Sequence, residues 1–161
     1  MKRAAIVIAL CACSKHDTSG DQSAIVKPQV FADISMSVPD GWTSSYDKDT
    51  DAWHVVSVDA RTTVQLERAD ERFVASPDAY MHHLEPRWPG KLVTIEQREH
   101  VAGGFVITLG VFAGANDPHA QHATYVVRKL GKVWYRCFAD GTEDEPLRNQ
   151  VIALCRSVRD R

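Results

Sequence analysis

Phe105-Val-Ile-Thr-Leu-Gly-Val-Phe-Ala113 is the stretch that decides the fold of this chain. Its apolar residues follow one another instead of alternating with polar ones, so both faces of a strand formed here must be covered. The preceding segment, residues 91–101, alternates apolar and polar residues and is typical of a half-exposed strand. Gly103-Gly104 lies between the two segments and permits a tight reversal. We therefore expect two antiparallel strands in a layered domain, the second of them buried on both sides.

Other parts of the chain repeat this pattern of strand and turn. Pro39-Asp40-Gly41 combines a fixed φ, a turn-forming aspartate and a glycine, and it ends one strand. Gly131-Lys132 is a glycine-first pair suited to a two-residue hairpin. The chain therefore predicts an antiparallel sheet of about six to seven strands. The remaining segments with strand character are 31–38, 53–58, 62–68, 122–130 and 133–139.

Two helices are expected to flank this sheet. Ser76-Pro77-Asp78 is typical of a helix start, with a serine N-cap, proline at the first helical position and an acid in the first turn. Pro86 ends that helix after about two turns. The second helix follows N-cap candidates at residues 142–144 and has an apolar stripe at helical spacing. The stripe consists of Leu147, Val151, Leu154, Cys155 and Val158.

Length, charge and the motif content limit the possible classes of protein. The chain has 161 residues, and strands joined by tight turns with helices packed on them predict one α+β domain over residues 30–161. The formal net charge is −2, and no cluster of basic and aromatic residues predicts a nucleic-acid surface. No Gly-x-Ser-x-Gly elbow and no phosphate-binding glycine loop occur. We expect neither a cofactor nor an enzymatic activity.

The N-terminal residues predict export. Two cations at Lys2 and Arg3 precede seven apolar residues and a small residue, which is the layout of a signal peptide over residues 1–12. Leu10-Cys11-Ala12-Cys13 resembles the bacterial lipobox, in which the last cysteine is lipidated, although Cys11 departs from its usual small or β-branched residue. The interpretation is a lipoprotein anchored at Cys13 by acyl chains such as palmitate. The alternatives are an ordinary cleaved signal and a buried N-terminal strand.

Residues 13–29 then predict the lipidated cysteine followed by a flexible tether, because the segment is polar and has no apolar period. An exported chain with this anchor would lie on the cell envelope and face the periplasm. Ser14, which follows the anchor cysteine, favours the outer membrane over the inner one by resemblance to enterobacterial sorting. The membrane would be contacted through the lipid.

The two cysteines within the domain predict a disulfide. Cys137 lies in a strand and Cys155 lies on the apolar stripe of the last helix, which faces the sheet. Export would place both residues where disulfides persist. The alternative is a pair of free cysteines that act as small buried apolar residues.

Two short motifs resemble a known superfamily. Ile34-Ser-Met-Ser-Val-Pro-Asp-Gly-Trp42 is similar to the entry strand of the superfamily that includes the photosystem subunit PsbP and the DcrB-type envelope lipoproteins. The ending Cys155-Arg-Ser-Val-Arg159 resembles the close of its terminal helix. The resemblance implies an α/β/α sandwich around an antiparallel sheet. It also implies a non-catalytic binding or assembly module, with no family catalytic residues to carry over.

Two groups of residues are candidates for a site. Trp42 and Trp88 could line a ligand groove, because aromatic residues are frequent anchors of binding sites; Trp88 is the tryptophan expected to be most exposed. Asp117, His119 and His122 could form a metal site, but a solvated loop with two ordinary histidines explains them as well.

The hypothesis is a non-catalytic, lipid-anchored envelope protein whose domain binds another envelope protein or a small ligand. A metal-dependent hydrolase that uses Asp117, His119 and His122 is one alternative. A periplasmic assembly chaperone is the other.

Overall fold

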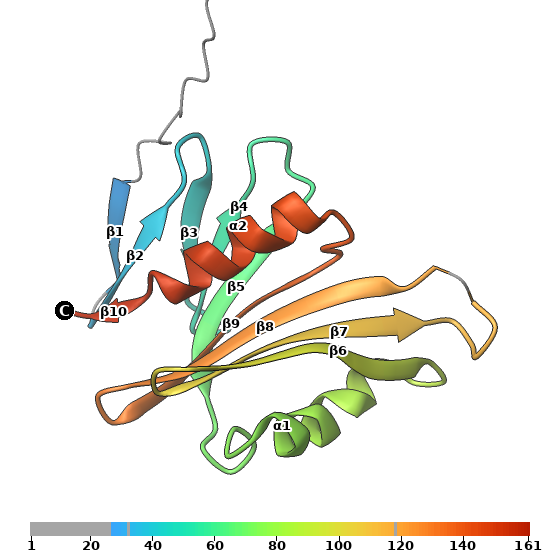
Figure 1. Cartoon of the computed structure of the whole chain (residues 1–161). Helices are drawn as coiled ribbons and strands as arrows, with labels where there is room; N and C mark the ends of the chain where they lie inside the picture. Colours follow the sequence, from blue (N-terminus) through green and yellow to red (C-terminus); the bar gives the residue numbers. More distant parts are fainter. Residues whose placement is uncertain (1–26, 32, 118) are drawn as a thin grey trace, which may run out of the picture.

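The fold is built from a large antiparallel sheet, a small sheet and two helices (Figure 1). The computed structural model describes residues 27–31, 33–117 and 119–161, so the expected signal peptide at residues 1–12 and the lipidation at Cys13 lie outside the described residues. The large sheet has seven strands in the order β3-β4-β5-β9-β8-β7-β6, and all its pairs are antiparallel. Its strands are β3 Thr43–Asp47, β4 Ala52–Val56, β5 Thr63–Ala69, β6 Leu92–Val101, β7 Gly104–Phe112, β8 Gln121–Leu130 and β9 Val133–Asp140.

The small sheet contains the two ends of the domain. β1 (Lys27–Phe31) and β10 (Arg159–Asp160) both pair with β2 (Ile34–Val38). The sequence predicts one strand over 31–38 and a tether up to residue 29, whereas the structure has a hairpin that starts at Lys27. β1 has no apolar alternation because it lies at a sheet edge, where backbone hydrogen bonds alone can hold a strand and a proline is tolerated.

β7 is buried on both faces, as its sequence predicts. Val106 contacts the apolar cluster beneath the C-terminal helix, and Ile107 and Leu109 contact the cluster beneath the first helix. All three side chains are fully buried. β6 covers the edge of β7 and remains largely exposed. The large sheet therefore lies between two layers, which we name the α2 face and the α1 face after the helix on each.

The α2 face is covered by α2 (Glu145–Arg156) and by β2 of the small sheet. The predicted stripe is buried at four of its five positions, and Leu147 is half-buried. Cys137 of β9 and Cys155 of α2 form the predicted disulfide, with their Cα atoms 5.5 Å apart. Arg128 of β8 donates hydrogen bonds to the carbonyls of Arg156 (2.8 Å) and Val158 (3.2 Å), so the end of α2 is tied to the sheet as well.

The α1 face is covered by a shorter helix, α1 (Pro77–Leu84), which continues as a 3₁₀ turn, η1 (Glu85–Arg87). Ser76 is the N-cap, and its hydroxyl accepts a hydrogen bond of 3.1 Å from the Ala79 N–H. The expected helix is therefore confirmed at both ends. Within the large sheet, sequence patterns missed β3, because its Thr-Ser-Ser-Tyr-Asp sequence is polar and forms the other edge of that sheet.

Candidate binding groove

A tight turn presents Trp42 at one end of the molecule. The Trp42 N–H donates to the Pro39 carbonyl at 3.2 Å, and Gly41 adopts a φ of +78° that few other residues tolerate. A Cβ at Gly41 would also lie 2.9 Å from Cγ2 of Val58, so the β4–β5 turn packs closely against this one. Trp42 is half-buried against the apolar cluster of the α2 face. The turn therefore fixes the ring with part of its surface open.

The open part of Trp42 borders a pocket of about 350 Å³, lined mainly by apolar surface, which we name the Trp42 groove. A pocket of this volume is within the range of small-ligand sites. The turn and the exposed side of the C-terminal helix supply its two walls. The lining includes Pro39, Asp40 and Trp42 from the turn, and Gln150, Ala153 and Leu154 from α2.

Ser157 fixes the distance between these two walls. Its hydroxyl oxygen accepts a hydrogen bond from the Ser37 N–H at 2.9 Å, and the same hydroxyl donates to the Leu154 carbonyl at 2.6 Å. Ser37 and Ser157 also line the groove. A hydrogen bond across 120 residues of chain therefore holds the end of α2 against β2 and joins the two walls of the groove.

The chain enters the described domain beside this groove. Lys27, the first residue of β1, is paired with Val38, the residue before Pro39. In Figure 1 the start of β1 and the β2–β3 turn lie at the same end of the molecule. Whatever precedes Lys27 in the chain is therefore attached next to the groove.

Trp88 lies on the opposite face of the sheet. It packs against the apolar cluster of the α1 face, and the Arg87 guanidinium lies 5.6 Å from its ring centroid. The 3₁₀ turn after α1 folds the Trp88 ring back onto the sheet, so this side chain is half-buried, as are those of Trp42 and Trp134. Trp42 and Trp88 are separated by the large sheet and cannot line one groove.

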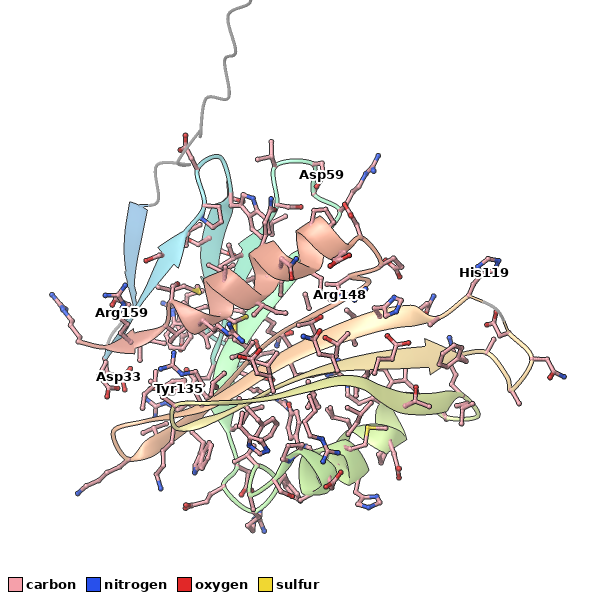
Figure 2. The ribbon with its side chains drawn as sticks, in the orientation of Figure 1. Asp33, Asp59, His119, Tyr135, Arg148 and Arg159 are labelled. Carbon is pink, nitrogen blue, oxygen red and sulfur yellow. A yellow bond between two sulfur atoms is a disulfide. The ribbon has the colours of Figure 1, made fainter. Side chains whose placement is uncertain are left out.

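The structure does not bring the proposed metal ligands together. The Asp117 carboxylate accepts hydrogen bonds from the backbone N–H groups of His119 (3.0 Å) and Ala113 (2.9 Å), and these bonds hold its pKa below the usual value. His119 is exposed on the loop after β7, away from both helices (Figure 2). His122 instead faces β6, where its Nε2 lies 2.9 Å from Oε2 of Glu96. Within residues 27–31, 33–117 and 119–161, no three His, Cys, Asp or Glu side chains are grouped as metal ligands.

Sequence patterns missed one wall of the groove. Gln150 and Ala153 lie beside the apolar stripe of α2, on helix positions that the pattern assigns to solvent. The available signal for a groove wall was the small side chain of Ala153. The other residues on that side of the helix are mostly polar and longer. Pattern analysis alone cannot say that a turn 110 residues earlier lies opposite it.

Comparison with known proteins identifies the fold. No family model matches the sequence, and no curated protein matches it. The solution structure of cyanobacterial PsbP (CyanoP) from Synechocystis sp. PCC 6803 superposes with a TM-score of 0.59 over 94% of this chain and 99% of that chain, at 12% identity. The chain has a PsbP-like fold.

The PsbP-like fold confirms the α/β/α sandwich that the two sequence motifs imply. The crystal structure of LpqN, described as involved in cell envelope biogenesis of Mycobacterium tuberculosis, gives a TM-score of 0.43 at 14% identity over 85% of this chain and 86% of that chain. No conclusion about this chain rests on that second similarity. Neither helix of the part of the chain that the structure describes has the length and apolar character needed to cross a bilayer.

Proposed function

We propose that this protein is a non-catalytic, lipid-anchored component of a bacterial cell envelope, whose PsbP-like domain binds a partner envelope protein through the Trp42 groove. The observation that carries the proposal is the position of the groove. It is a largely apolar pocket between the β2–β3 turn and α2, and it lies beside the point at which the chain enters the described domain. An anchor on the preceding segment would therefore hold the groove on the membrane-proximal side.

The anchor is proposed to be Cys13, whose lipobox context supports diacylation and a third acyl chain. Two or more acyl chains give stable membrane residence, whereas one chain is marginal. The 14 residues from Cys13 to Lys27 would span roughly 20 Å as a flexible coil, so the groove would stay close to the membrane surface. Location in the outer membrane, suggested by Ser14, is part of the same proposal.

A partner segment with a protruding apolar side chain suits this groove best. Trp42 offers a ring fixed by its turn, and rigid aromatic residues in pockets are frequent centres of protein interfaces. Gln150, Asp40 and the two serines around the ring can pair with backbone groups of the inserted segment. The positions of the proposed hydrolase residues support a non-catalytic role. The Asp117 carboxylate accepts hydrogen bonds from backbone groups of its own loop, and His122 faces Glu96.

Site-specific photo-crosslinking in the native envelope tests the partner. A photo-crosslinking amino acid at Ala153, in the groove wall, should yield one or a few discrete crosslinked proteins. The same amino acid at His82, exposed on the α1 face, is the matched control and should yield none of them. The Trp42→Ala variant should lose the crosslink while the domain still unfolds cooperatively. Equal crosslinking from Ala153 and His82 would contradict a binding role for the groove.

Fractionation tests the anchor separately. The Cys13→Ala variant should leave the membrane fraction, because nothing else in the proposal attaches the domain to lipid. Full partition of this variant with membranes would contradict the anchor without affecting the crosslinking result.

A further inference from the structure

A second pocket, of about 200 Å³, lies on the α1 face and has a different character from the Trp42 groove. Its wall is formed by the loop between β5 and α1, by α1 itself and by β9. We name it the Tyr80 pocket. The residues used below are Asp70 and Phe73 of the loop, Tyr80 and His83 of α1, and Arg136 of β9.

Tyr80 contributes a buried hydroxyl that donates to no acceptor among the described residues. The side chain is 1% exposed, and its Oη forms no hydrogen bond of ordinary geometry with any residue that the structure describes. The Arg136 guanidinium is close enough to lower the pKa of this hydroxyl, although burial outweighs that effect and raises the pKa to about 12. The hydroxyl is therefore protonated at neutral pH and is available as a donor. A buried donor without an acceptor is rare and needs a physical explanation.

Arg136 contributes further donors at the same pocket. It is half-buried and forms an ion pair through Nε with Oε1 of Glu67, its neighbour across β5 and β9. The guanidinium also lies beside the Tyr80 hydroxyl, close enough to influence its pKa. Two parallel N–H groups of a guanidinium match the two oxygens of a carboxylate.

The lining of the pocket carries two arginines, Arg68 and Arg136, against one carboxylate, Asp70. The pKa of His83 is lowered by burial first, then by Arg136 and Arg87, with Asp70 acting in the opposite direction. Burial raises the pKa of Tyr80. Among the charged neighbours, Arg136 and Arg87 lower this pKa and Glu67 raises it, and the effect of Arg136 is larger than that of Glu67. Asp70 at the rim is itself paired with Arg72 through two of its guanidinium nitrogens. A negative ligand would therefore enter a favourable field.

The remaining wall is aromatic. The rings of Phe73 and His83 are stacked with their centroids 4.0 Å apart, and the Tyr80 ring lies 6.2 Å from that of His83. This wall offers apolar contact to the body of a ligand whose polar end faces Arg136. A volume of about 200 Å³ is below the range of drug-sized sites and limits the body to about the size of one ring.

We propose that the Tyr80 pocket binds a small carboxylate, whose oxygens accept hydrogen bonds from the Arg136 guanidinium and the Tyr80 hydroxyl while its apolar body lies against Phe73 and His83. The site lies across the sheet from the Trp42 groove, so it stands independently of the partner and the anchor proposed above. The carboxylate could belong to a free molecule or to the C-terminus of a peptide.

Binding of benzoate to the purified domain, followed by amide chemical shifts, tests this site. Benzoate should shift the signals of 69–73 and of α1 with a Kd in the millimolar range or below. Benzamide has the same shape without the charge and should bind at least tenfold more weakly. A tetrapeptide that ends in a phenylalanine carboxylate distinguishes the two sources, since tighter binding than benzoate would assign a peptide terminus and weaker binding a free carboxylate.

Three variants locate the contacts. Tyr80→Phe removes only the hydroxyl and should weaken benzoate binding by about tenfold, because hydrogen bonds to charged groups are among the stronger ones. Arg136→Lys keeps the charge beside Glu67 but removes the paired N–H groups, and should weaken binding at least as much. Tyr125→Phe is the matched control: Tyr125 is also buried on the α1 face, but its hydroxyl already interacts with Arg87 (3.2 Å) and Asp140 (3.4 Å). It should leave benzoate binding unchanged.

Three results would overturn the proposal. One is an absence of shifts in the wild-type protein at 20 mM benzoate, a concentration on the order of ten times a millimolar Kd. Another is equal benzoate affinity of the wild type and Tyr80→Phe, with both proteins folded by their thermal transitions. Inorganic phosphate binding more tightly than benzoate would also overturn it, because the ligand would then not be a carboxylate.

Discussion

The two faces of the large sheet differ in how they are covered. On the α2 face, a three-turn helix and the small sheet cover an almost wholly apolar cluster, and a disulfide joins the helix to the sheet. The Tyr135 hydroxyl donates to Asp33 at 3.1 Å and links the two sheets at the edge of that cluster (Figure 2). On the α1 face, a two-turn helix covers a cluster in which aromatic rings meet arginines.

This difference suggests that the two faces of the domain carry different kinds of binding site. Apolar packing and the disulfide close the α2 face. The groove at the end of this face offers mainly apolar surface, so we expect it to select a ligand by its shape. The α1 face combines aromatic rings with arginines around the buried Tyr80 hydroxyl, so the pocket on this face offers polar groups as well as apolar surface. We therefore expect substitutions on the two faces to change the stability of the domain by different amounts.

The largest expected effect tests whether the α1 face belongs to the cooperative core. Leu84 is fully buried there, and Leu84→Ala should lower the free energy of unfolding by about 3 to 4 kcal/mol, because it removes buried methyl groups and leaves a cavity. Urea unfolding measures this change. Its neighbour His82 is exposed, and His82→Ala should change the free energy by less than about 0.5 kcal/mol. A small effect of Leu84→Ala would mean that α1 detaches before the sheet unfolds.

Removal of the disulfide tests the covalent link of the α2 face. The double variant Cys137→Ala/Cys155→Ala opens a loop with a sequence separation of 18 residues, and should lower the free energy of unfolding by about 3 kcal/mol. The comparison is between the variant and the oxidised wild type in urea. Equal midpoints would show that the bridge adds nothing to the packing of α2.

Helix capping offers a smaller contrast between the faces. Ser76 caps α1 through its hydroxyl, whereas Asp144 precedes α2 without a side-chain cap hydrogen bond. Ser76→Ala should therefore cost about 1 kcal/mol of unfolding free energy. Asp144→Ala should cost less, since only its charge near the helix N-terminus is lost. Thermal unfolding of both variants measures the difference, and a reversed order would refute the role of the Ser76 cap.

The smallest effect concerns acid stability at the rim of the Tyr80 pocket. Hydrogen bonds from Arg72 lower the pKa of Asp70 from 3.8 to about 2 in the folded state. The pair therefore stabilises the fold fully above about pH 4, and this contribution is lost as the pH falls from about 4 to about 2. Asp70→Asn should show a flatter dependence of stability on pH in that window. An unchanged slope in urea titrations would show that the pair is solvated.

Elements with strong local signals were predictable from the sequence. The buried strand, the hairpin at Gly131-Lys132 and both helices follow from periodicity, turn chemistry and caps, and the disulfide follows from the helix stripe. β1 and β3 were missed because edge strands are held by backbone pairing and need no apolar alternation. β1 begins at Lys27, before the predicted start of the domain at residue 30.

The sites were harder to predict because their walls come from distant parts of the chain. Trp42 borders a groove, but the helix wall of that groove depends on how α2 packs across the sheet. Trp88 was proposed for the same groove as an aromatic residue expected to be exposed, although the two tryptophans lie on opposite faces of the sheet. Arg136 left a signal that was overlooked: it is a charged residue in the middle of an otherwise apolar strand, and such a residue needs a partner.

Mass spectrometry of the N-terminal peptide from native membranes tests the central claim most directly. The account predicts a peptide that begins at Cys13 and carries a thioether-linked diacylglyceryl group. A peptide that begins with unmodified Met1, recovered from the cytosol, would contradict the envelope location and the orientation of the Trp42 groove towards a membrane.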